Sequence, residues 1–246
     1  MIFFYIFSFF LGAILGSFLD CVIFRLERKE NFLKGRSYCP NCHHLLSFFD
    51  LIPIFSFLIL KGKCRYCKKP IPLEHFLMEI ASAILFSFLT FLHFKRFPIN
   101  FFSFLSLIFE FGIWSCFVLI FVFDLKHYLI PDEAIYVGIF FSLFRAFVLK
   151  INLFNLFLAI LPSLFFLFLI LISKEEWMGW GDFKLSILTG VYLGWPKVLI
   201  ALFCGIFIGS VFGIIFILLK KMTLKSKIPF APFLISGIFL SLFILL

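Results

Sequence analysis

Long apolar runs dominate this chain of 246 residues and restrict what it can fold into. Hydrophobic residues make up 63% of the sequence, 44 residues are phenylalanine, and the mean hydropathy is +1.16. Several of the runs reach the roughly 18 residues that a helix needs to cross a lipid bilayer. The sequence therefore predicts an all-α polytopic membrane protein.

We expect about eight transmembrane helices, counting each apolar run as one span. The runs cover residues 2–24, 76–94, 101–123, 133–149, 153–172, 183–194, 197–219 and 229–246. With the N-terminus outside, most of the 22 Lys and Arg residues fall on one side of the membrane. This asymmetry is the positive-inside pattern, so the basic side is expected to be cytoplasmic. The formal charge of +9 is then explained by the membrane topology, with lipid as the partner, and it does not indicate a nucleic-acid partner.

The first apolar run is expected to be a retained span rather than a cleaved signal peptide. A signal peptide carries its basic residues before the apolar stretch, whereas Arg25 and Arg28 follow it here. Asp20 lies near the cytoplasmic end of this span. We expect it to serve at the interface, where Arg25 is a candidate partner.

Two Cys-x-x-Cys pairs stand in the one sizeable polar segment, residues 27–75. They are Cys39, Cys42, Cys64 and Cys67. Zinc binds four thiolates tetrahedrally, and a shell closed in this way leaves no position for an activated water. The segment is therefore predicted to be a small cytoplasmic zinc-binding domain that depends on a structural zinc ion for its fold. Two redox pairs are the alternative, although nothing around them resembles a thioredoxin βαβ unit. His43 and His44 adjoin the first pair and are expected to be solvated rather than ligands.

Two carboxylates beside apolar runs are candidates for chemistry, because ionisable groups there are costly. Asp124 follows the apolar run 101–123 directly, at a helix C-terminal end where the dipole disfavours an anion. Asp132 comes after Pro131 and is explained as the first acid of the next helix. Asp182 lies in the stretch Gly179-Trp180-Gly181-Asp182-Phe183-Lys184.

The predicted topology places Asp124 and Asp182 at the same membrane face. Two carboxylates that share one proton can activate water for peptide hydrolysis, with one as base while the other polarises the carbonyl. Taken alone, the two acids would also fit interfacial helix caps or a cation transport site. Glu110 and Arg145 lie deeper within spans and are expected to form a structural ion pair.

Five blocks of the chain, in order, resemble the prepilin peptidase family, also called type IV leader peptidases, which are aspartyl proteases of the GxGD type. The blocks are the run Gly16-Ser17-Phe18-Leu19-Asp20-Cys21, the paired cysteines, residues 124–132, residues 179–184, and Pro229-Phe230-Ala231-Pro232-Phe233.

The resemblance implies a multi-pass enzyme of the bacterial inner membrane that removes the short basic leader of type IV prepilins and pseudopilins. Asp124 and Asp182 would be the catalytic pair at the cytoplasmic face. Gly179 and Gly181 would let an extended substrate approach closely, and Lys184 would orient Asp182 or reach the interface. Many relatives also methylate the new N-terminus with S-adenosylmethionine, for which the sequence assigns no binding residues here.

The expected organisation is a first transmembrane span at 1–26, a four-cysteine zinc-binding domain at 27–75, and a transmembrane aspartyl protease domain at 76–246. Three other functions remain open: a GxGD protease for other membrane substrates, a transporter, and a non-enzymatic assembly factor. A transporter would favour charges at the bilayer midplane, whereas Asp124 and Asp182 stand at span ends. The sequence indicates no oligomeric state.

Overall fold

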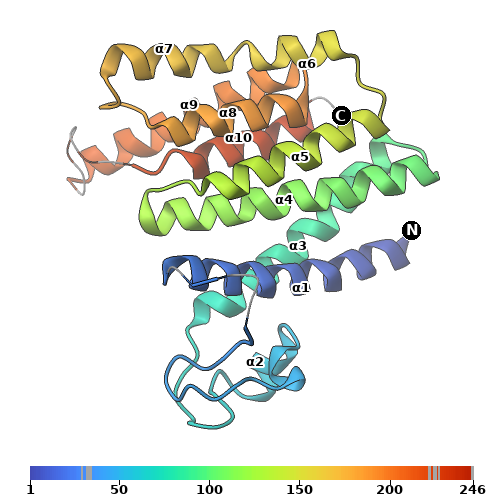
Figure 1. Ribbon diagram of the computed structural model, residues 1–246, viewed down its shortest axis with the longest axis vertical. Helices are drawn as coiled ribbons and strands as arrows, with labels where there is room; N and C mark the ends of the chain where they lie inside the picture. The colour runs from blue at the N-terminus through green and yellow to red at the C-terminus, as the bar shows by residue number, and fades with distance from the viewer. Residues whose placement is uncertain (29, 32–34, 221–222, 224–225, 227, 245–246) are drawn as a thin grey trace. The chain divides into compact units, whose positions relative to one another are not determined.

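The computed structural model describes residues 1–28, 30–31, 35–220, 223, 226 and 228–244 (Figure 1). Within these ranges the regular secondary structure is helical, apart from isolated β-bridges that join Tyr38 to Leu45 and Lys63 to Pro70. The elements are α1 (Ile2–Glu27), the 3-10 helix η1 (Phe48–Leu51), α2 (Phe55–Ile59), α3 (Leu73–Arg96), α4 (Phe101–His127), α5 (Asp132–Val148), α6 (Leu153–Ile160), α7 (Ser163–Ser173), α8 (Trp180–Leu193), α9 (Lys197–Leu218) and α10 (Ala231–Ile244). The predicted all-α class is confirmed.

Among the described residues, five stretches are long and apolar enough to cross a membrane, which confirms a multi-pass membrane protein. They are α1, α3, α4, the pair α6–α7 over Leu153–Ser173, and α9. The other three predicted spans coincide with α5, α8 and α10, which have 17, 14 and 14 residues. At 1.5 Å per residue, 14 residues reach only about 21 Å, less than the hydrocarbon core. The count of eight spans is therefore not confirmed, and residues 245–246 of the last one lie outside the described residues.

The chain divides into two compact units, Met1–Phe94 and Lys95–Leu246. The first unit contains α1, the polar segment and nearly all of α3, and the second contains α4 to α10. By this division, α3 belongs to the same compact unit as the residues before it. The predicted boundaries after residues 26 and 75 divide the chain by function, and they stay a prediction.

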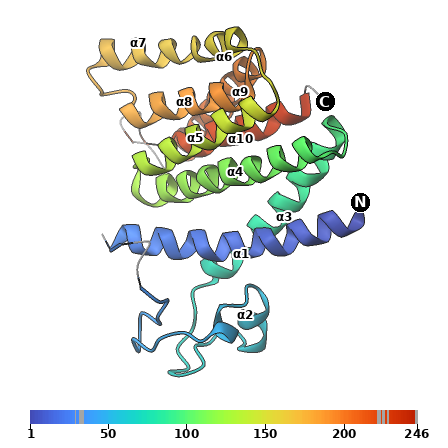
Figure 2. The same cartoon turned by 45° about the vertical axis from the view of Figure 1, so that its right-hand side comes forward.

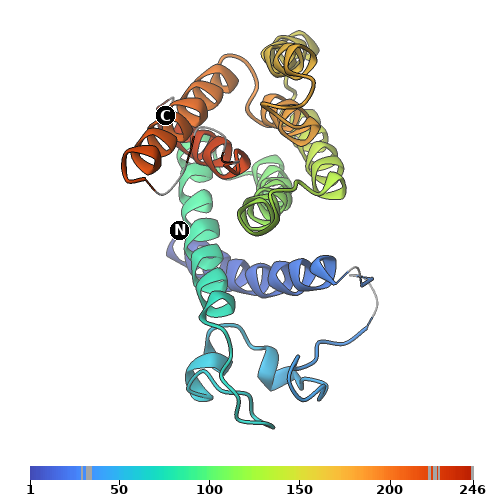
Figure 3. The same cartoon turned by 90° about the vertical axis from the view of Figure 1, so that its left-hand side faces the viewer.

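Within the first unit, α1 and α3 cross through small residues (Figure 3). A Cβ atom added at Gly12 would lie 2.8 Å from the Cβ of Phe86, and one added at Gly16 would lie 2.8 Å from the Cβ of Ser82. Small residues of this kind let helix backbones approach closely in membranes. Larger side chains at either glycine would push the two helices apart.

The polar segment forms a lobe that includes α2 and is anchored to both helices of its unit (Figure 2). Phe55 stacks on Phe10 of α1 at 6.4 Å between ring centroids, and Phe57 stacks on Phe76 of α3 at 4.6 Å. The Ile54 backbone N–H, just before α2, donates to Glu79 Oε2 at 2.7 Å. The apolar part of the lobe therefore packs on the helices of its own unit.

In the second unit, α5 packs against both α4 and α8, and the axes of the three helices are roughly aligned, with α4 running opposite to the other two (Figure 3). α10 packs along α9, where a Cβ atom added at Gly205 would lie 2.9 Å from the Cα of Leu234. The C-terminal end of α4 and the N-terminal ends of α5, α8 and α10 lie at the same end of this unit (Figure 1). This arrangement brings together segments that are far apart in the sequence.

A buried polar cluster ties α4, α5 and α8 together and contains the predicted Glu110–Arg145 pair. Glu110 Oε2 lies 3.7 Å from the Arg145 guanidinium, and the two residues are only 2% and 8% exposed. Tyr192 donates its hydroxyl to Glu110 Oε1 at 2.8 Å, and Trp114 donates its indole N–H to the Tyr192 hydroxyl at 2.8 Å. The pair is thus one part of a hydrogen-bonded network.

Replacing Glu110 or Arg145 with Gln, singly and together, is expected to destabilise the protein non-additively. Each single change leaves a buried charge without its partner, at a cost of about 3–5 kcal/mol. The double variant should be less destabilised than the sum of the single variants by about 1–3 kcal/mol. Thermal unfolding in detergent measures this difference, and additive losses would mean that the pair makes no coupled contribution.

Candidate active site and metal centre

Asp124 lies in the last turn of α4, and the structure supplies the anion stabilisation that its own helix lacks. The residue is 4% exposed, and α4 ends three residues later at His127, before a left-handed Tyr128 whose N–H donates to the Asp124 carbonyl at 2.9 Å. The Ala231 backbone N–H, at the N-terminus of α10, donates to Asp124 Oδ2 at 3.1 Å. The positive end of the α10 dipole therefore faces this carboxylate.

Asp182 lies in the first turn of α8, at the other wall of the site. Its Oδ2 accepts a hydrogen bond from the Gly179 backbone N–H at 3.3 Å, which caps the start of the helix. An acid in the first turn of a helix is favoured by the dipole. Capping alone thus explains an acid at this position, and a catalytic role needs the partner carboxylate.

The two predicted carboxylates are brought together in the second unit. Asp182 experiences electrostatic repulsion from Asp124, although 57 intervening residues separate them in the sequence. Two carboxyl groups that repel one another in a partly buried setting favour holding one proton between them. The arrangement can therefore supply a base and an acid at the same place.

The segment that follows Asp124 is held against the start of α8 by two contacts. A Cβ atom added at Gly181 would lie 3.0 Å from the Cβ of Ile130, so this glycine lets the two segments touch. Lys184 Nζ donates to both carboxylate oxygens of Asp132, at 2.8 and 2.7 Å. Lys184 thus joins α8 to α5 through Asp132, whereas the sequence suggested Asp182 as its partner.

Gly179 differs from Gly181 in its surroundings. A Cβ atom added at Gly179 would meet nothing within 4 Å. Its backbone, at φ −89° and ψ 161°, is extended and suits any residue. The open space beside Gly179 is consistent with the expected approach of an extended substrate, while Gly181 is needed for packing within the protein.

The two Cys-x-x-Cys turns adopt the same local backbone. Cys39 N–H donates to the His44 carbonyl at 3.0 Å, and Cys64 N–H donates to the Lys69 carbonyl at 2.9 Å. The residues that come four after each first cysteine, His43 and Lys68, have left-handed φ of 56° and 59°. Each turn therefore presents its two sulfur atoms in the same way, as two matched zinc knuckles do.

The four predicted ligands Cys39, Cys42, Cys64 and Cys67 converge, with all four Sγ atoms within 4.8 Å of one another. Cys39 Sγ and Cys67 Sγ are 3.9 Å apart. Zn–S bonds of about 2.3 Å in a tetrahedron place sulfur atoms roughly 3.8 Å apart, so the cluster fits zinc. Burial raises the pKa of the Cys39 thiol, but hydrogen bonds from the Cys42 and Asn41 backbones lower it to about 7. The thiolate, which is the form that binds metal, is thereby favoured at Cys39.

His43 and His44 do not belong to the four-cysteine group that could hold a metal among the described residues. The His43 ring stacks on Tyr38 at 5.8 Å, and the His44 ring lies 3.6 Å from that of Tyr66. The contact between His44 and Tyr66 joins the first knuckle to the second. Both histidines therefore contribute packing.

Asp50 links the segment that follows the first knuckle to the second knuckle. It accepts hydrogen bonds from the Ser47 hydroxyl at 2.7 Å, from Arg65 Nε at 2.6 Å and from the Tyr66 hydroxyl at 3.0 Å. Burial raises the pKa of Asp50, but these hydrogen bonds outweigh burial and lower the pKa to about 2. The Asp50 carboxylate is thus ionised at neutral pH and ties this segment to the second knuckle.

Two contacts at functional positions were not foreseen from the sequence. Asp20 bonds through Oδ2 to His75 Nδ1 at 2.5 Å, whereas the sequence suggested Arg25 as its partner. Arg25 donates to the Gly35 carbonyl at 3.1 Å. The other contact is the Ala231 N–H on Asp124. Both join residues that are remote in the sequence, and no local pattern in the chain signals either.

Family models match both units of the chain. The model described as the bacterial Peptidase A24 N-terminal domain covers residues 10–94, and that of the type IV leader peptidase family covers residues 111–214. The first match contains all four cysteines, and the second contains Asp124 and Asp182.

Curated relatives match nearly the whole chain. A protein of Bacillus subtilis is 32% identical over 93% of this chain and 90% of its own length. One of Aeromonas hydrophila is 31% identical over 92% and 86%, and one of Pseudomonas aeruginosa is 29% identical over 91% and 84%. Each is named a prepilin leader peptidase/N-methyltransferase. No solved structure matches this chain.

Proposed function

The chain belongs to the type IV leader peptidase family, and from that premise we propose that it cleaves prepilins with Asp124 and Asp182 as its catalytic pair. The family and the named relatives indicate that this protein is a prepilin peptidase. The observation that supports these two residues is their placement at one end of the second unit, close enough for the Asp124 carboxylate to repel that of Asp182.

In the proposed mechanism one carboxylate removes a proton from water while the other, protonated, polarises the scissile carbonyl. The Ala231 N–H donates to Asp124 Oδ2 and would hold this carboxylate in place, which suits Asp124 to the role of base. Asp182 then holds the proton and donates it toward the carbonyl oxygen. As water attacks, charge develops on that oxygen, where the Asp182 proton stabilises it.

The proposed location is the bacterial inner membrane, with the catalytic pair and the zinc lobe on the cytoplasmic side. The basic residues concentrate on that side in the predicted topology. Prepilins and pseudopilins, with short basic leaders, are the proposed substrates. The four converging thiol groups would hold a structural zinc ion, whose closed shell leaves catalysis to the carboxylates.

N-Methylation of the new N-terminus is the second proposed activity, because the relatives are named peptidase/N-methyltransferases. S-Adenosylmethionine would supply the methyl group. Incubation of a prepilin with the protein in membranes, with and without S-adenosylmethionine, tests both activities through the mass of the product N-terminus. We expect loss of the leader in both reactions, and one added methyl group in the first. An intact leader in both would reject the proposed function.

Replacing Gly181 with Ala is expected to lower leader cleavage by about 10- to 100-fold, because small displacements of catalytic groups are costly. The added Cβ atom would press on Ile130 and shift the segment that follows Asp124. Such overpacking should also cost about 1–3 kcal/mol of stability.

Gly179→Ala is the matched control for stability in this experiment, since its added Cβ atom meets nothing. Thermal unfolding should therefore separate the two variants, with Gly179→Ala close to wild type. Equal stability and wild-type cleavage by Gly181→Ala would mean that the contact with Ile130 does not position the site.

A further inference from the structure

Residues 48–60 of the zinc lobe, which contain η1 and α2, form an apolar segment between the two knuckles. Five of its large apolar side chains are between 50% and 78% exposed: Phe48, Phe49, Phe55, Leu58 and Ile59. An apolar stretch of about 10–14 residues is too short to cross a bilayer and is typical of an interfacial or re-entrant segment. Exposed apolar surface of this kind marks an interaction site for protein or membrane.

The contacts of this segment place it beside the middle of a helix that is long and apolar enough to cross a membrane. Phe55 stacks on Phe10 of α1 at 6.4 Å between ring centroids. About 15 residues of α1, roughly 22 Å along its axis, separate Phe10 from Arg25 at the basic end of the helix. Figures 1 and 2 show α2 level with the middle of α1 and not beyond its end. Exposed side chains at this depth would face hydrocarbon rather than water.

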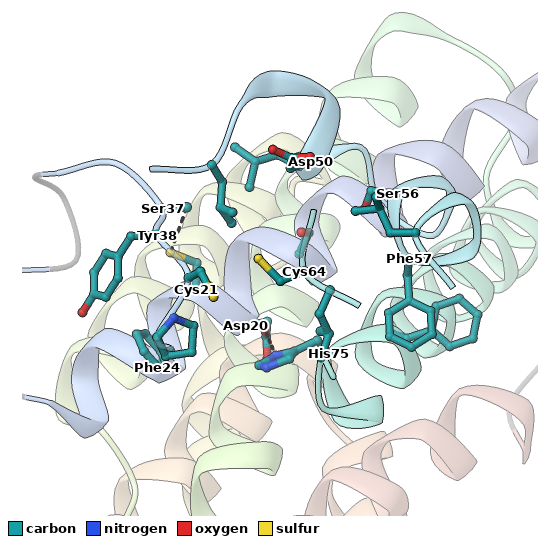
Figure 4. A pocket seen from close by; sticks show the side chains of 18 of the residues that line it. Asp20, Cys21, Phe24, Ser37, Tyr38, Asp50, Ser56, Phe57, Cys64 and His75 are labelled. Atoms are coloured by element: carbon teal, nitrogen blue, oxygen red, sulfur yellow. Dashed lines mark hydrogen bonds and ion pairs between the residues drawn. The ribbon is translucent and has the colours of Figure 1, made fainter. Parts of the chain in front are cut away.

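The lobe extends along α1, so its first knuckle and α2 lie at different depths. Tyr38, beside the first cysteine, packs edge-on against Phe24 near the basic end of α1, at 6.1 Å between ring centroids. Ile54, just before α2, instead bonds to Glu79, which lies about 9 Å along α3 from its start. Tyr38 and Phe57 of α2 lie on opposite sides of the cavity that both residues line (Figure 4).

The backbone around α2 is closed to hydrogen bonding with solvent in the way that a lipid environment requires. Pro53 has no N–H, and the next donor, the N–H of Ile54, is taken by the Glu79 carboxylate at 2.7 Å. Hydrogen bonds to backbone carbonyls of the same segment occupy the N–H groups of residues 55, 56, 58 and 60–63. Because hydrocarbon offers no hydrogen-bond partners, a segment in lipid must satisfy its backbone in this internal way.

The chain becomes basic directly after the apolar segment. Residues 61–72 contain no acid and five basic residues, of which the four lysines are exposed: Lys61, Lys63, Arg65, Lys68 and Lys69. The Gly62 carbonyl accepts a hydrogen bond from the Ile71 N–H at 2.8 Å, two residues before α3 begins. This basic stretch therefore lies beside the start of α3, where exposed lysines can reach anionic lipid headgroups.

We propose that residues 48–60 insert into the lipid leaflet on the side of the zinc lobe, with the lysines that follow on anionic headgroups. The inference goes beyond leader cleavage, because it concerns how the lobe is held. Two observations favour lipid over a second protein as the occupant of this surface. The segment is continuous with α1 and α3 through its aromatic stacks, and its basic flank matches the charge of an anionic membrane surface.

A photoreactive side chain at the exposed Ile59 tests the insertion in the full-length protein. Irradiation of Ile59→p-benzoylphenylalanine in vesicles of phosphatidylcholine and phosphatidylglycerol should give a product heavier by one phospholipid. Asn41→p-benzoylphenylalanine is the matched control, because Asn41 is exposed in the first knuckle. We expect about tenfold more lipid adduct from position 59 than from position 41, since only a side chain in the hydrocarbon core is surrounded by acyl chains.

The identity of the attached lipid tests the role of the basic residues. In vesicles with equal amounts of the two lipids, phosphatidylglycerol should be enriched about fivefold in the adduct at position 59, because lysines near the surface attract anionic lipid. Lys61→Gln and Lys63→Gln together, in the same photoreactive variant, should lower this enrichment. Mass spectrometry of the irradiated protein measures both the yield and the identity of the lipid.

Equal yields of lipid adduct from positions 59 and 41 would overturn the insertion. A product at position 59 with twice the mass of the protein would also overturn it, because a second copy of the chain would then cover α2. Unchanged enrichment of phosphatidylglycerol after Lys61→Gln and Lys63→Gln would reject headgroup binding by these lysines.

Discussion

Asp124→Asn and Asp182→Asn are each expected to abolish leader cleavage, with rates lowered by about 10³- to 10⁴-fold. Asparagine keeps the size of either side chain but can neither accept the proton from water nor supply one to the scissile carbonyl. Because the two carboxylates act as one unit, losing either should cost nearly as much as losing both. Cleavage rates on a prepilin in membranes measure this effect.

Asp132→Asn is the matched control for those two variants. Asp132 is a third acid at the same end of the second unit, but its carboxylate bonds Lys184 and its side chain is 48% exposed. An exposed ion pair of this kind contributes about 0–1 kcal/mol, so the change should reduce cleavage only mildly. Near-normal cleavage by Asp124→Asn or Asp182→Asn, in protein that inserts normally, would show that these two residues are not the catalytic pair.

Loss of the metal is expected to unfold the lobe that contains the four cysteines. Structural zinc contributes about 10–16 kcal/mol of binding free energy in small zinc-dependent peptides, which is folding free energy for such a segment. Replacing Cys39 and Cys64 with Ser removes one ligand from each knuckle and should abolish zinc binding. Metal analysis of the purified protein should find zinc in wild type and none in the double variant.

Limited proteolysis should then cut the lobe of the Cys39→Ser/Cys64→Ser variant about 100-fold faster than that of wild type, since cleavage follows the open population. Cys204→Ser is the matched control, because Cys204 lies in α9 and outside the metal-binding group. Wild-type protein that contains no metal, together with unchanged activity in the double variant, would contradict a structural zinc site.

The sequence predicts the parts of this protein that depend on local composition and spacing. Helix class follows from the apolar runs, and the metal cluster follows from paired cysteines, whose four sulfur atoms do converge. The Glu110–Arg145 pair was also foreseen, because few partners exist for a charge within a span. These features need no knowledge of how distant segments meet.

Other contacts between distant segments were not predicted. The sequence shows that Asp124 lies at a helix C-terminus, where the dipole of its own helix disfavours an anion. Nothing nearby in the sequence shows that the Ala231 N–H stabilises this carboxylate. Lys184 follows Asp182 by two residues, yet its partner Asp132 is 52 residues away, and only tertiary packing decides between them. The bounds of α8 also differ from the apolar run 183–194, since the helix begins at Trp180 and Asp182 caps its first turn.

The pH dependence of leader cleavage by the wild-type protein tests the shared-proton pair most directly. With one carboxylate ionised and the other protonated, kcat/KM should rise and then fall with pH, because both the doubly protonated and the doubly ionised pair are inactive. A bell-shaped profile is therefore expected. A rate that rises with pH to a plateau would contradict it, since cleavage would then need a single ionised group and no protonated partner.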